Sequence, residues 1–521
     1  MTTPRRPRVS EEHAVNRAMP QIENIVFVMM ENRSLDNLLG WLYETSAPQH
    51  YYPADNRTPY DGLVAGRYHN PARSWTGGVH QYPVVPIPSK HEKKRVPAYD
   101  PYEAFREGAS PEWNGVMNQC FGNEDRIGVM PKPPAAARML GFLQDYYARY
   151  MVDWQGLDVL WTYTPAQLPL INSLARHYAV SDRWFSSVPT QTNPNRAYSI
   201  CGTSAGREAN ANLQANEHYD LPTIFNKLAD AGKSWGLYYE DIWHDKKCFT
   251  EYTFPHMSSA GNGEVGTMSQ FKASAANGTL PSFTYLEPKW GYGKGTLYVQ
   301  GDDYHPPTLV APGDQFLWDT YLAIRNGPQW SKTLFIVTFD EHGGTYDHVG
   351  PPWTAINPDG ITGTKWGFKF DLYGTRVPTL LISPYIAPRT VFRAPSGSAL
   401  PFDHTSFIST LLLWAGVSPA TAGMGKRVAS APRFDGVLSS TPVNTSDVTQ
   451  KPVAFEPVAV ARPEAPAEAP PAGQQLNALF EGMPFASVRA ILGRSESIED
   501  AHAALATFRK DPDKFEATLG D

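Results

Sequence analysis

Short apolar runs alternate with stretches of helical periodicity along most of this 521-residue chain. The apolar runs have the length and composition of buried strands, and they cover residues 23–30, 233–241, 282–288, 333–341 and 377–385. Apolar positions recur every three or four residues in 164–179, 221–232 and 313–327, and this spacing predicts helices. The alternation is typical of an α/β fold in which a mostly parallel central sheet is flanked by helices on both faces.

The pattern changes near residue 440. Proline, alanine and glutamate dominate residues 451–473, a composition that favours an extended linker over a packed core. Helical periodicity then returns, which predicts a small C-terminal helical extension that could serve as an arm for oligomerisation. We therefore expect four parts: an N-terminal extension (1–21), a main domain (22–440), a linker (441–473) and a helical module (474–521).

Composition and charge are those of a folded protein that does not bind nucleic acid. Apolar residues make up 41% of the chain, charged residues only 19%, and the formal net charge is −7. A phosphate-bearing substrate would have to be held by a local site, since the overall surface charge does not attract it, and a bound cation is one way to do so.

The cysteines and the apolar runs limit where the protein can reside. Cys120, Cys201 and Cys248 have no CxxC spacing, so we expect neither a disulfide framework nor a zinc ribbon. The first twenty residues lack the apolar region of a signal peptide, and no run of about 18 apolar residues could span a bilayer. We expect a cytoplasmic protein, or one exported without a cleavable signal peptide.

Two predicted strands end in side chains that can bind a cation. Glu31 and Asn32 directly follow the strand 23–30, and Asp340 and Glu341 complete the run 333–341. The carboxyl ends of parallel strands share one edge of a sheet, which is where such folds bind ligands. Carboxylate and amide oxygens favour a hard divalent cation, Ca²⁺, Mg²⁺ or Mn²⁺, over zinc.

Further candidate chemistry surrounds these strand ends. "TFDEHGGTYDHVGPP" (338–352) adds His342 and His348; an Asp–Glu pair alone is more often a polar turn, but the complete string favours a site. In "PTQTNPNRAYSICGTSAG" (189–206), a metal or a base could activate a hydroxyl as a nucleophile, and an arginine could hold phosphate oxygens. The hydroxyls are those of Thr190, Thr192 and Ser199, and the arginine is Arg196. Two loop histidines, His305 and His404, gain weight only if their loops converge on the same site.

Six motifs in order, from about residue 22 to about residue 416, resemble the bacterial phospholipase C and acid phosphatase family, to which the plant non-specific phospholipases C also belong. They are "MENRSLDN", "TNPNR", "YHPP", "FDEHGGTYDHVGPP", "RVPTLLISPY" and "FDHTSF". The resemblance implies an alkaline-phosphatase-like α/β sandwich that hydrolyses phosphoesters with a metal-assisted Ser or Thr nucleophile.

The resemblance also implies roles for individual residues. By motif position, Thr192 matches the nucleophile, and the metal ligands are Glu31, Asn32, Thr192, Asp340 and Glu341. His305 corresponds to a histidine at the substrate phosphate, and His348 and His404 are weaker candidates for catalysis. We assign Arg196 and His342 to substrate binding.

The chain departs from the family pattern at three positions. Leu35 and Asn37 replace an aromatic residue and a histidine, and Glu103 stands where the plant enzymes carry a histidine. The main hypothesis is a phospholipase C-type phosphodiesterase that acts on phospholipid with peripheral membrane contact. The alternatives are a broad-specificity acid phosphatase acting on small phosphoesters, and a secreted effector that keeps the fold without turnover.

Overall fold

The computed structural model describes most of the chain between residues 18 and 453. The described residues are 18–73, 79–87, 115–122, 135–145, 159–210, 218–243, 245–294, 297–306, 308–364 and 367–453. Most of the predicted linker, the predicted helical module at 474–521 and Glu103 lie outside these ranges.

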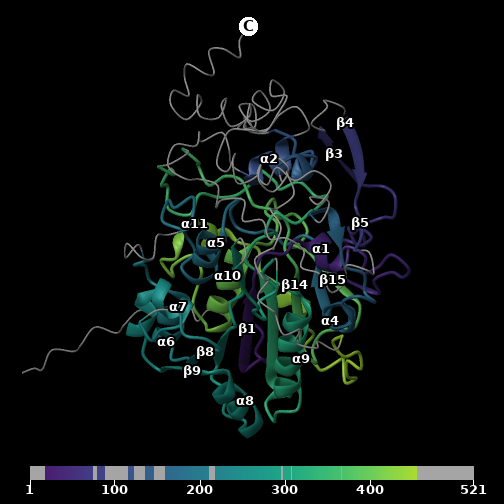
Figure 1. The fold of residues 1–521 in the computed structure, drawn as a ribbon. Coiled ribbons are helices and arrows are strands. Elements are labelled where there is room, and N and C mark those ends of the chain that lie inside the picture. Colours follow the sequence, from purple (N-terminus) through teal and green to yellow (C-terminus); the bar gives the residue numbers. More distant parts are fainter. Residues whose placement is uncertain are drawn as a thin grey trace, which may run out of the picture.

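A nine-stranded sheet forms the centre of the fold (Figure 1). Its order is β2 (His50–Tyr52), β15 (Thr390–Phe392), β7 (Ala179–Ser181), β14 (Thr379–Ile382), β13 (Thr333–Phe339), β1 (Asn24–Met30), β10 (Phe283–Glu287), β8 (Trp235–Tyr239) and β9 (Gly263–Thr267). Only β14 runs antiparallel to its neighbours, and all other pairs in this sheet are parallel. The five predicted strands and the mostly parallel sheet are confirmed.

The two central strands, β1 and β13, are buried along their whole length. They pair in parallel register from Asn24 opposite Thr333 to Met30 opposite Phe339. Their continuous apolar sequences follow from this position, because helices cover both faces and leave neither face to water. The register also brings the residues after Met30 and Phe339 to the same edge of the sheet.

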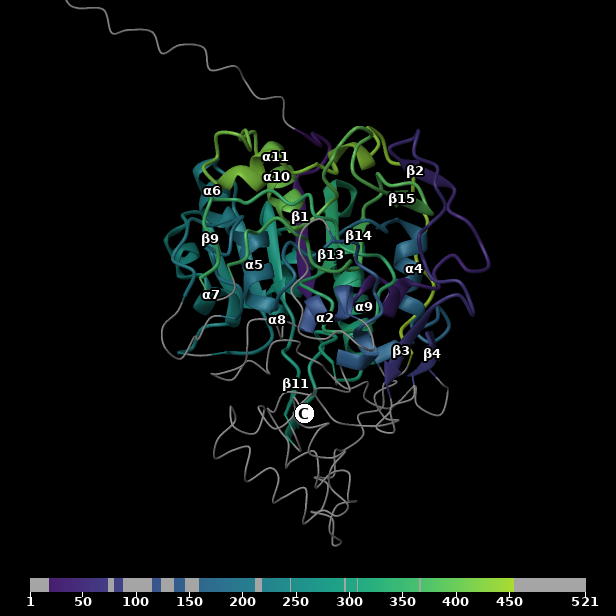
Figure 2. The same cartoon turned by 90° about the horizontal axis from the view of Figure 1, so that it is seen from above.

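Helices cover the sheet in two groups (Figures 1 and 2). One group consists of α5 (Thr192–Ile200), α6 (Ile224–Asp230), α10 (His404–Trp414) and α11 (Gly425–Ser430). The other consists of α4 (Pro169–His177), α8 (Met268–Asn277) and α9 (Ala311–Arg325). The three predicted helices correspond to α4, α6 and α9. Phe27 of β1 stacks on Phe407 of α10, with ring centroids 4.0 Å apart, so the aromatic side chains join sheet and helix into one core.

Smaller elements surround this core. Short helices are α1 (Leu35–Leu39), α2 (Gly115–Phe121) and α7 (Phe249–Thr253). Two-stranded sheets pair β3 (His69–Arg73) with β4 (Val79–Pro83), β5 (Val85–Pro86) with β6 (Trp161–Thr162), and β11 (Tyr292–Lys294) with β12 (Leu297–Val299). Among the described helices, none combines the length and the apolar character required to cross a bilayer.

The main domain extends beyond the predicted boundary at residue 440. Asn444 donates a hydrogen bond from Nδ2 to the carbonyl of His177 at 2.7 Å, Asp447 pairs with Arg325 at 2.5 Å, and Val448 is buried in the core. At the other end, Met19 is also buried. Residues on both sides of the predicted domain thus contact its core, and only the fold shows what they pack against.

Candidate active site

Glu31 and Asp340 directly follow the paired ends of β1 and β13. Asp340 continues the ladder, since its N–H donates to the carbonyl of Met30 at 3.1 Å. Its Oδ1 accepts hydrogen bonds from the backbone N–H groups of Asn32 at 2.9 Å and Glu341 at 2.7 Å. Its Oδ2 is buried without a hydrogen-bond partner. The backbone therefore fixes one oxygen of Asp340 and leaves the other available to a ligand.

Asn32 turns the chain sharply after β1. Its φ of 56° lies in the left-handed region, which asparagine tolerates better than most residues. The turn packs against Gly343, where an added Cβ would lie 2.2 Å from the Asn32 carbonyl oxygen. Gly343 must therefore remain glycine for Asn32 to keep its position. The Asn32 amide is then directed toward Thr192 on one side and His305 on the other.

Thr192 is the first residue of α5, and its hydroxyl meets both residues that follow β1. Oγ1 lies 3.3 Å from Glu31 Oε2 and 3.5 Å from Asn32 Oδ1. The positive end of a helix dipole at this position favours a bound anion such as phosphate. The two rival hydroxyls bond elsewhere: Thr190 donates to the carbonyl of Glu208 at 2.5 Å, and Ser199 to the carbonyl of Arg196 at 2.8 Å.

Arg196, one helical turn after Thr192, is fully buried and bound to Glu31. Its Nε and Nη2 both donate to Glu31 Oε1, at 3.0 and 2.6 Å. Nη2 also donates to the carbonyl of Met29 at 2.9 Å, and Nη1 to the hydroxyl of Tyr285 at 3.3 Å. With these contacts, Arg196 fixes Glu31, which favours a positioning role over the substrate contact predicted from sequence.

The two buried acids at the strand ends are suited to a divalent cation. Burial raises the pKa of Glu31 to about 7, although the neighbouring Arg196 opposes the shift. Burial and the charge of Glu31 hold the pKa of Asp340 well above its usual range. A cation bound between them would favour the ionised forms. Glu31 Oε2 and Asn32 Oδ1 both lie near Thr192 Oγ1, and Asp340 Oδ2 is buried without a hydrogen-bond partner. Oxygens of these kinds fit Ca²⁺, Mg²⁺ or Mn²⁺.

Glu341, the fifth predicted ligand, has a different orientation. Its Oε2 accepts a hydrogen bond from the backbone N–H of Gly343 at 2.6 Å and lies 3.5 Å from His342 Nδ1. These contacts hold Oε2 against the backbone that follows β13.

His305 lies at the half-buried rim of this group. Its Nε2 is 3.2 Å from Asn32 Nδ2, and its Nδ1 bonds to the carbonyl of Pro306. Its backbone N–H donates to Asp303 Oδ1 at 3.1 Å, so the buried Asp303, which the sequence did not indicate, positions this loop. Of the predicted histidines, His305 is the one that contacts a predicted metal ligand through its side chain and is also partly exposed.

His404 and His342 are buried and neutral. His404 donates from Nε2 to the carbonyl of Asp340 at 2.7 Å and accepts at Nδ1 from Trp184 at 3.4 Å, and burial lowers its pKa to about 4. His342 Nε2 bonds to Gln119 Oε1 at 2.6 Å, and burial lowers its pKa to about 3. In this arrangement His404 supports the backbone of Asp340, and His342 is held by Gln119.

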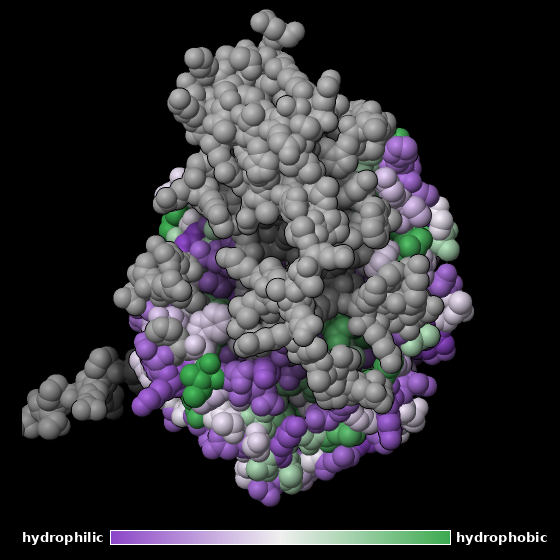
Figure 3. All heavy atoms as spheres, viewed as in Figure 1, coloured by the Kyte–Doolittle hydropathy of each residue, from purple (hydrophilic) through white to green (hydrophobic). Residues whose placement is uncertain are grey.

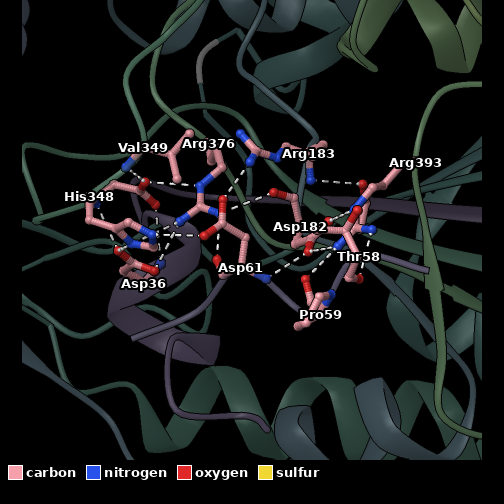
Figure 4. A network of polar contacts seen from close by, with 12 residues as sticks. Asp36, Thr58, Pro59, Asp61, Asp182, Arg183, His348, Val349, Arg376 and Arg393 are labelled. Atoms are coloured by element: carbon pink, nitrogen blue, oxygen red, sulfur yellow. Dashed lines mark hydrogen bonds and ion pairs between the residues drawn. The ribbon is translucent and has the colours of Figure 1, made fainter. Parts of the chain in front are cut away.

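His348 belongs to a separate network of charges (Figure 4). Its Nδ1 lies 2.6 Å from Asp36 Oδ2 and its Nε2 3.1 Å from Asp61 Oδ1. Burial lowers the pKa of His348, but Asp36 and Asp61 outweigh this effect and raise it to about 9. His348 is therefore an imidazolium at neutral pH, held by two carboxylates.

The same network contains a group of metal-ligand type. Within the described ranges, Asp36, Asp347 and His348 form the one set of three such side chains whose ligand atoms all lie within 4.8 Å of one another. Arg376 is buried beside them and donates to Asp36 Oδ1 at 3.0 Å and to Asp347 Oδ1 at 2.9 Å. The guanidinium supplies positive charge beside these side chains, so they form a buried ion-pair network with Arg376 in this structure.

Sequence reasoning missed Asp36 and Arg376, although both lie within quoted motifs. Asn37, which replaces a family histidine, accepts a hydrogen bond from Arg33 at 3.3 Å and donates one to the carbonyl of Trp161 at 2.9 Å. This departure from the family pattern is thus accommodated inside the fold.

Known proteins with similar sequences cover most of this chain. The chain is 34% identical to "Non-specific phospholipase C1" of Arabidopsis thaliana over 394 residues, which cover 75% of this chain and 66% of the relative. It is 31% identical to "Non-specific phospholipase C6" of the same plant, over 92% of this chain and 85% of the relative. "Phospholipase C B" of Mycobacterium tuberculosis is 28% identical, over 77% and 74%.

Among solved structures, the chain shows a distant likeness to a protein of the alkaline phosphatase superfamily from Vibrio parahaemolyticus. The TM-score is 0.31 and the identity 15%, over 63% of this chain and 83% of that one. The model of the phosphoesterase family matches residues 22–417, a range that holds every residue of the site described above. On this match, together with the plant relatives, the chain belongs to the phosphoesterase family.

Proposed function

We propose that this chain is a metal-dependent phospholipase C that cleaves a glycerophospholipid with Thr192 as its nucleophile. The observation that carries the proposal is the position of Thr192 Oγ1 at the start of α5, 3.3 Å from Glu31 Oε2 and 3.5 Å from Asn32 Oδ1. Membership of the phosphoesterase family and similarity to proteins named phospholipase C support the reaction class and the lipid substrate.

In this proposal the residues that would hold the divalent cation are Glu31, Asn32, Thr192, Asp340 and Glu341. Asp340 Oδ2, which is buried without a hydrogen-bond partner, supports this assignment. The bound cation would lower the pKa of the hydroxyl and offset negative charge on the phosphoryl group.

The reaction proceeds in two steps. Thr192 Oγ1 attacks phosphorus and forms a new P–O bond while the P–O bond to diacylglycerol breaks. The hydroxyl proton has Glu31 Oε2 as its near acceptor. In this proposal His305 gives a proton to the leaving oxygen, after its Nε2 has taken up that proton and left Asn32 Nδ2. Water then cleaves the phosphothreonine, which releases the phosphorylated head group and restores the hydroxyl.

The test compares two substrate classes with the same protein. The full chain, stripped of metal and resupplied with Ca²⁺, Mg²⁺ or Mn²⁺, is assayed on phospholipid vesicles and on a chromogenic phosphomonoester. We expect cation-dependent release of diacylglycerol. Activity on the monoester alone would favour the broad acid phosphatase, and no turnover of either would favour the effector.

Membrane contact and oligomerisation remain predictions. On the described part of the face shown in Figure 3, hydrophobic residues are scattered among hydrophilic ones. The exposed large apolar side chains of the described residues likewise come from separate segments, as Val64, Trp243 and Ile361 illustrate.

A further inference from the structure

The guanidinium of Arg196 lies between Glu31 and an aromatic wall. On one side it contacts Glu31 through the two hydrogen bonds described above. On the other side it lies over the ring of Trp290, 4.7 Å from the centroid, with the ring of Phe249 at 6.0 Å. Indole is the aromatic side chain that attracts a cation most strongly. Here the guanidinium is buried and Trp290 is half-buried.

A buried acid holds this aromatic wall in place. Glu287, the last residue of β10, is fully buried, and its Oε1 accepts hydrogen bonds from Trp290 Nε1 and from the backbone N–H of Phe249, each at 2.9 Å. Its Oε2 accepts from the backbone N–H of Thr250 at 2.8 Å. One carboxylate therefore fixes both the indole and the first turn of α7.

The orientation of Arg196 decides which oxygen of Glu31 is available. An arginine and a carboxylate commonly form a fork in which each oxygen takes one N–H group. Here Nε and Nη2 both donate to Oε1, and Oε2 is left near Thr192. Asp340 Oδ2, only 3.9 Å from Nε, is a competing partner for a guanidinium that shifts. A displaced Arg196 would thus take up an oxygen that the cation needs.

We propose that Trp290, held by Glu287, is a positioning residue that acts through Arg196 to keep Glu31 Oε2 directed at the divalent cation and at Thr192. The inference rests on the proposed function, because it requires the cation site. Supporting groups of this kind outside the ligand set typically change metal affinity by roughly 10- to 100-fold when they are removed.

The test measures cation affinity of the full chain by titration calorimetry, with Ca²⁺, Mg²⁺ and Mn²⁺ each used alone. We expect Trp290→Leu to weaken binding by roughly tenfold or more. Trp290→Phe keeps a ring face but loses the N–H group, so its cation affinity should fall between those of the wild type and Trp290→Leu. The matched control is Trp330→Leu. The ring of Trp330 also lies against an arginine, with its centroid 5.4 Å from the guanidinium of Arg325, the last residue of α9. The cation affinity of this control should equal that of the wild type.

A second readout separates positioning from general loss of structure. At saturating cation, Trp290→Leu should recover most of the wild-type kcat, because its defect is in ligand orientation. If Trp290→Leu does not fold, Glu287→Gln takes its place. The glutamine amide keeps the shape of the acid but has only one acceptor oxygen, so it loses part of the hydrogen bonding that holds Trp290 and α7. We then expect the same weakening of cation binding to a smaller extent.

Two outcomes would be decisive in different ways. A wild-type chain that binds no cation would overturn the metal centre and the proposed function with it. A wild-type chain that binds, beside a folded Trp290→Leu or Glu287→Gln variant that binds equally well, would overturn this inference alone.

Discussion

Arg196 gives two hydrogen bonds to a single oxygen of Glu31 and leaves the other oxygen 3.3 Å from the hydroxyl of Thr192. Both charged groups are buried, and a buried ion pair gives little net stability because both ions lose their hydration. The pair is better explained by the orientation it gives to Glu31. Arg196 holds one carboxylate oxygen, and the other is directed at Thr192, where α5 begins.

The first prediction concerns cation binding by Asp340. Asp340→Ala should abolish cation uptake, because the buried Oδ2 is a proposed ligand and has no hydrogen-bond partner. Elemental analysis of the folded variant checks this. The control is Asp319→Ala, because Asp319 is a half-buried acid of α9 that pairs with Lys272. Wild-type cation content in Asp340→Ala would contradict the assignment.

The second prediction concerns pH and the cation. The pKa of Glu31 is raised to about 7, so protons compete with the cation as the pH falls through 7. Cation affinity should therefore be strongest above pH 7 and decrease toward pH 5. Calorimetry across this range checks the prediction, and an affinity independent of pH would show that Glu31 is not a ligand.

The third prediction identifies the nucleophile. Thr192→Ala should lose several orders of magnitude in rate, whereas Thr192→Ser keeps the oxygen and should retain activity. Mass spectrometry of acid-quenched enzyme, incubated with phospholipid, should find the phosphorylated head group on the peptide that contains Thr192. Phosphate on Thr190 or Ser199, the rival hydroxyls, would overturn the assignment.

The fourth prediction concerns stability and His348. Its pKa is raised to about 9 in the folded chain, above the ordinary value of about 6.5. The stability that its ion pairs contribute is complete below about pH 6.5 and is lost as the pH rises through 9. Urea unfolding should show this loss for the wild type and a much smaller one for His348→Gln. Equal pH dependence in both would exclude His348 as the titrating group.

The fifth prediction concerns the end of the main domain. A chain that ends at Val453 should fold and keep activity, whereas one that ends at Thr445 loses the Asp447–Arg325 pair and the buried Val448. The shorter chain should therefore unfold at a lower temperature in a thermal melt. Equal melting temperatures would show that residues 446–453 contribute nothing to the fold.

The main strands, the mostly parallel sheet and the acids that follow β1 and β13 could all be predicted from the sequence. These features depend on local patterns: continuous apolar runs that only a sheet covered on both faces can bury, followed at once by Glu31 or Asp340. Two such strands in parallel place their carboxyl ends together, so the meeting of these acids was predictable before the structure.

The tertiary structure decided what each polar side chain does. The sequence could not show that Arg196 faces inward to Glu31, because its partner lies 165 residues away. Nor could it show that His348 pairs with Asp61, that Trp290 covers Arg196, or that residues after 440 pack on the core. A charged residue in a motif has the same appearance whether it contacts substrate or a buried counter-ion, and only burial and distance separate the two roles.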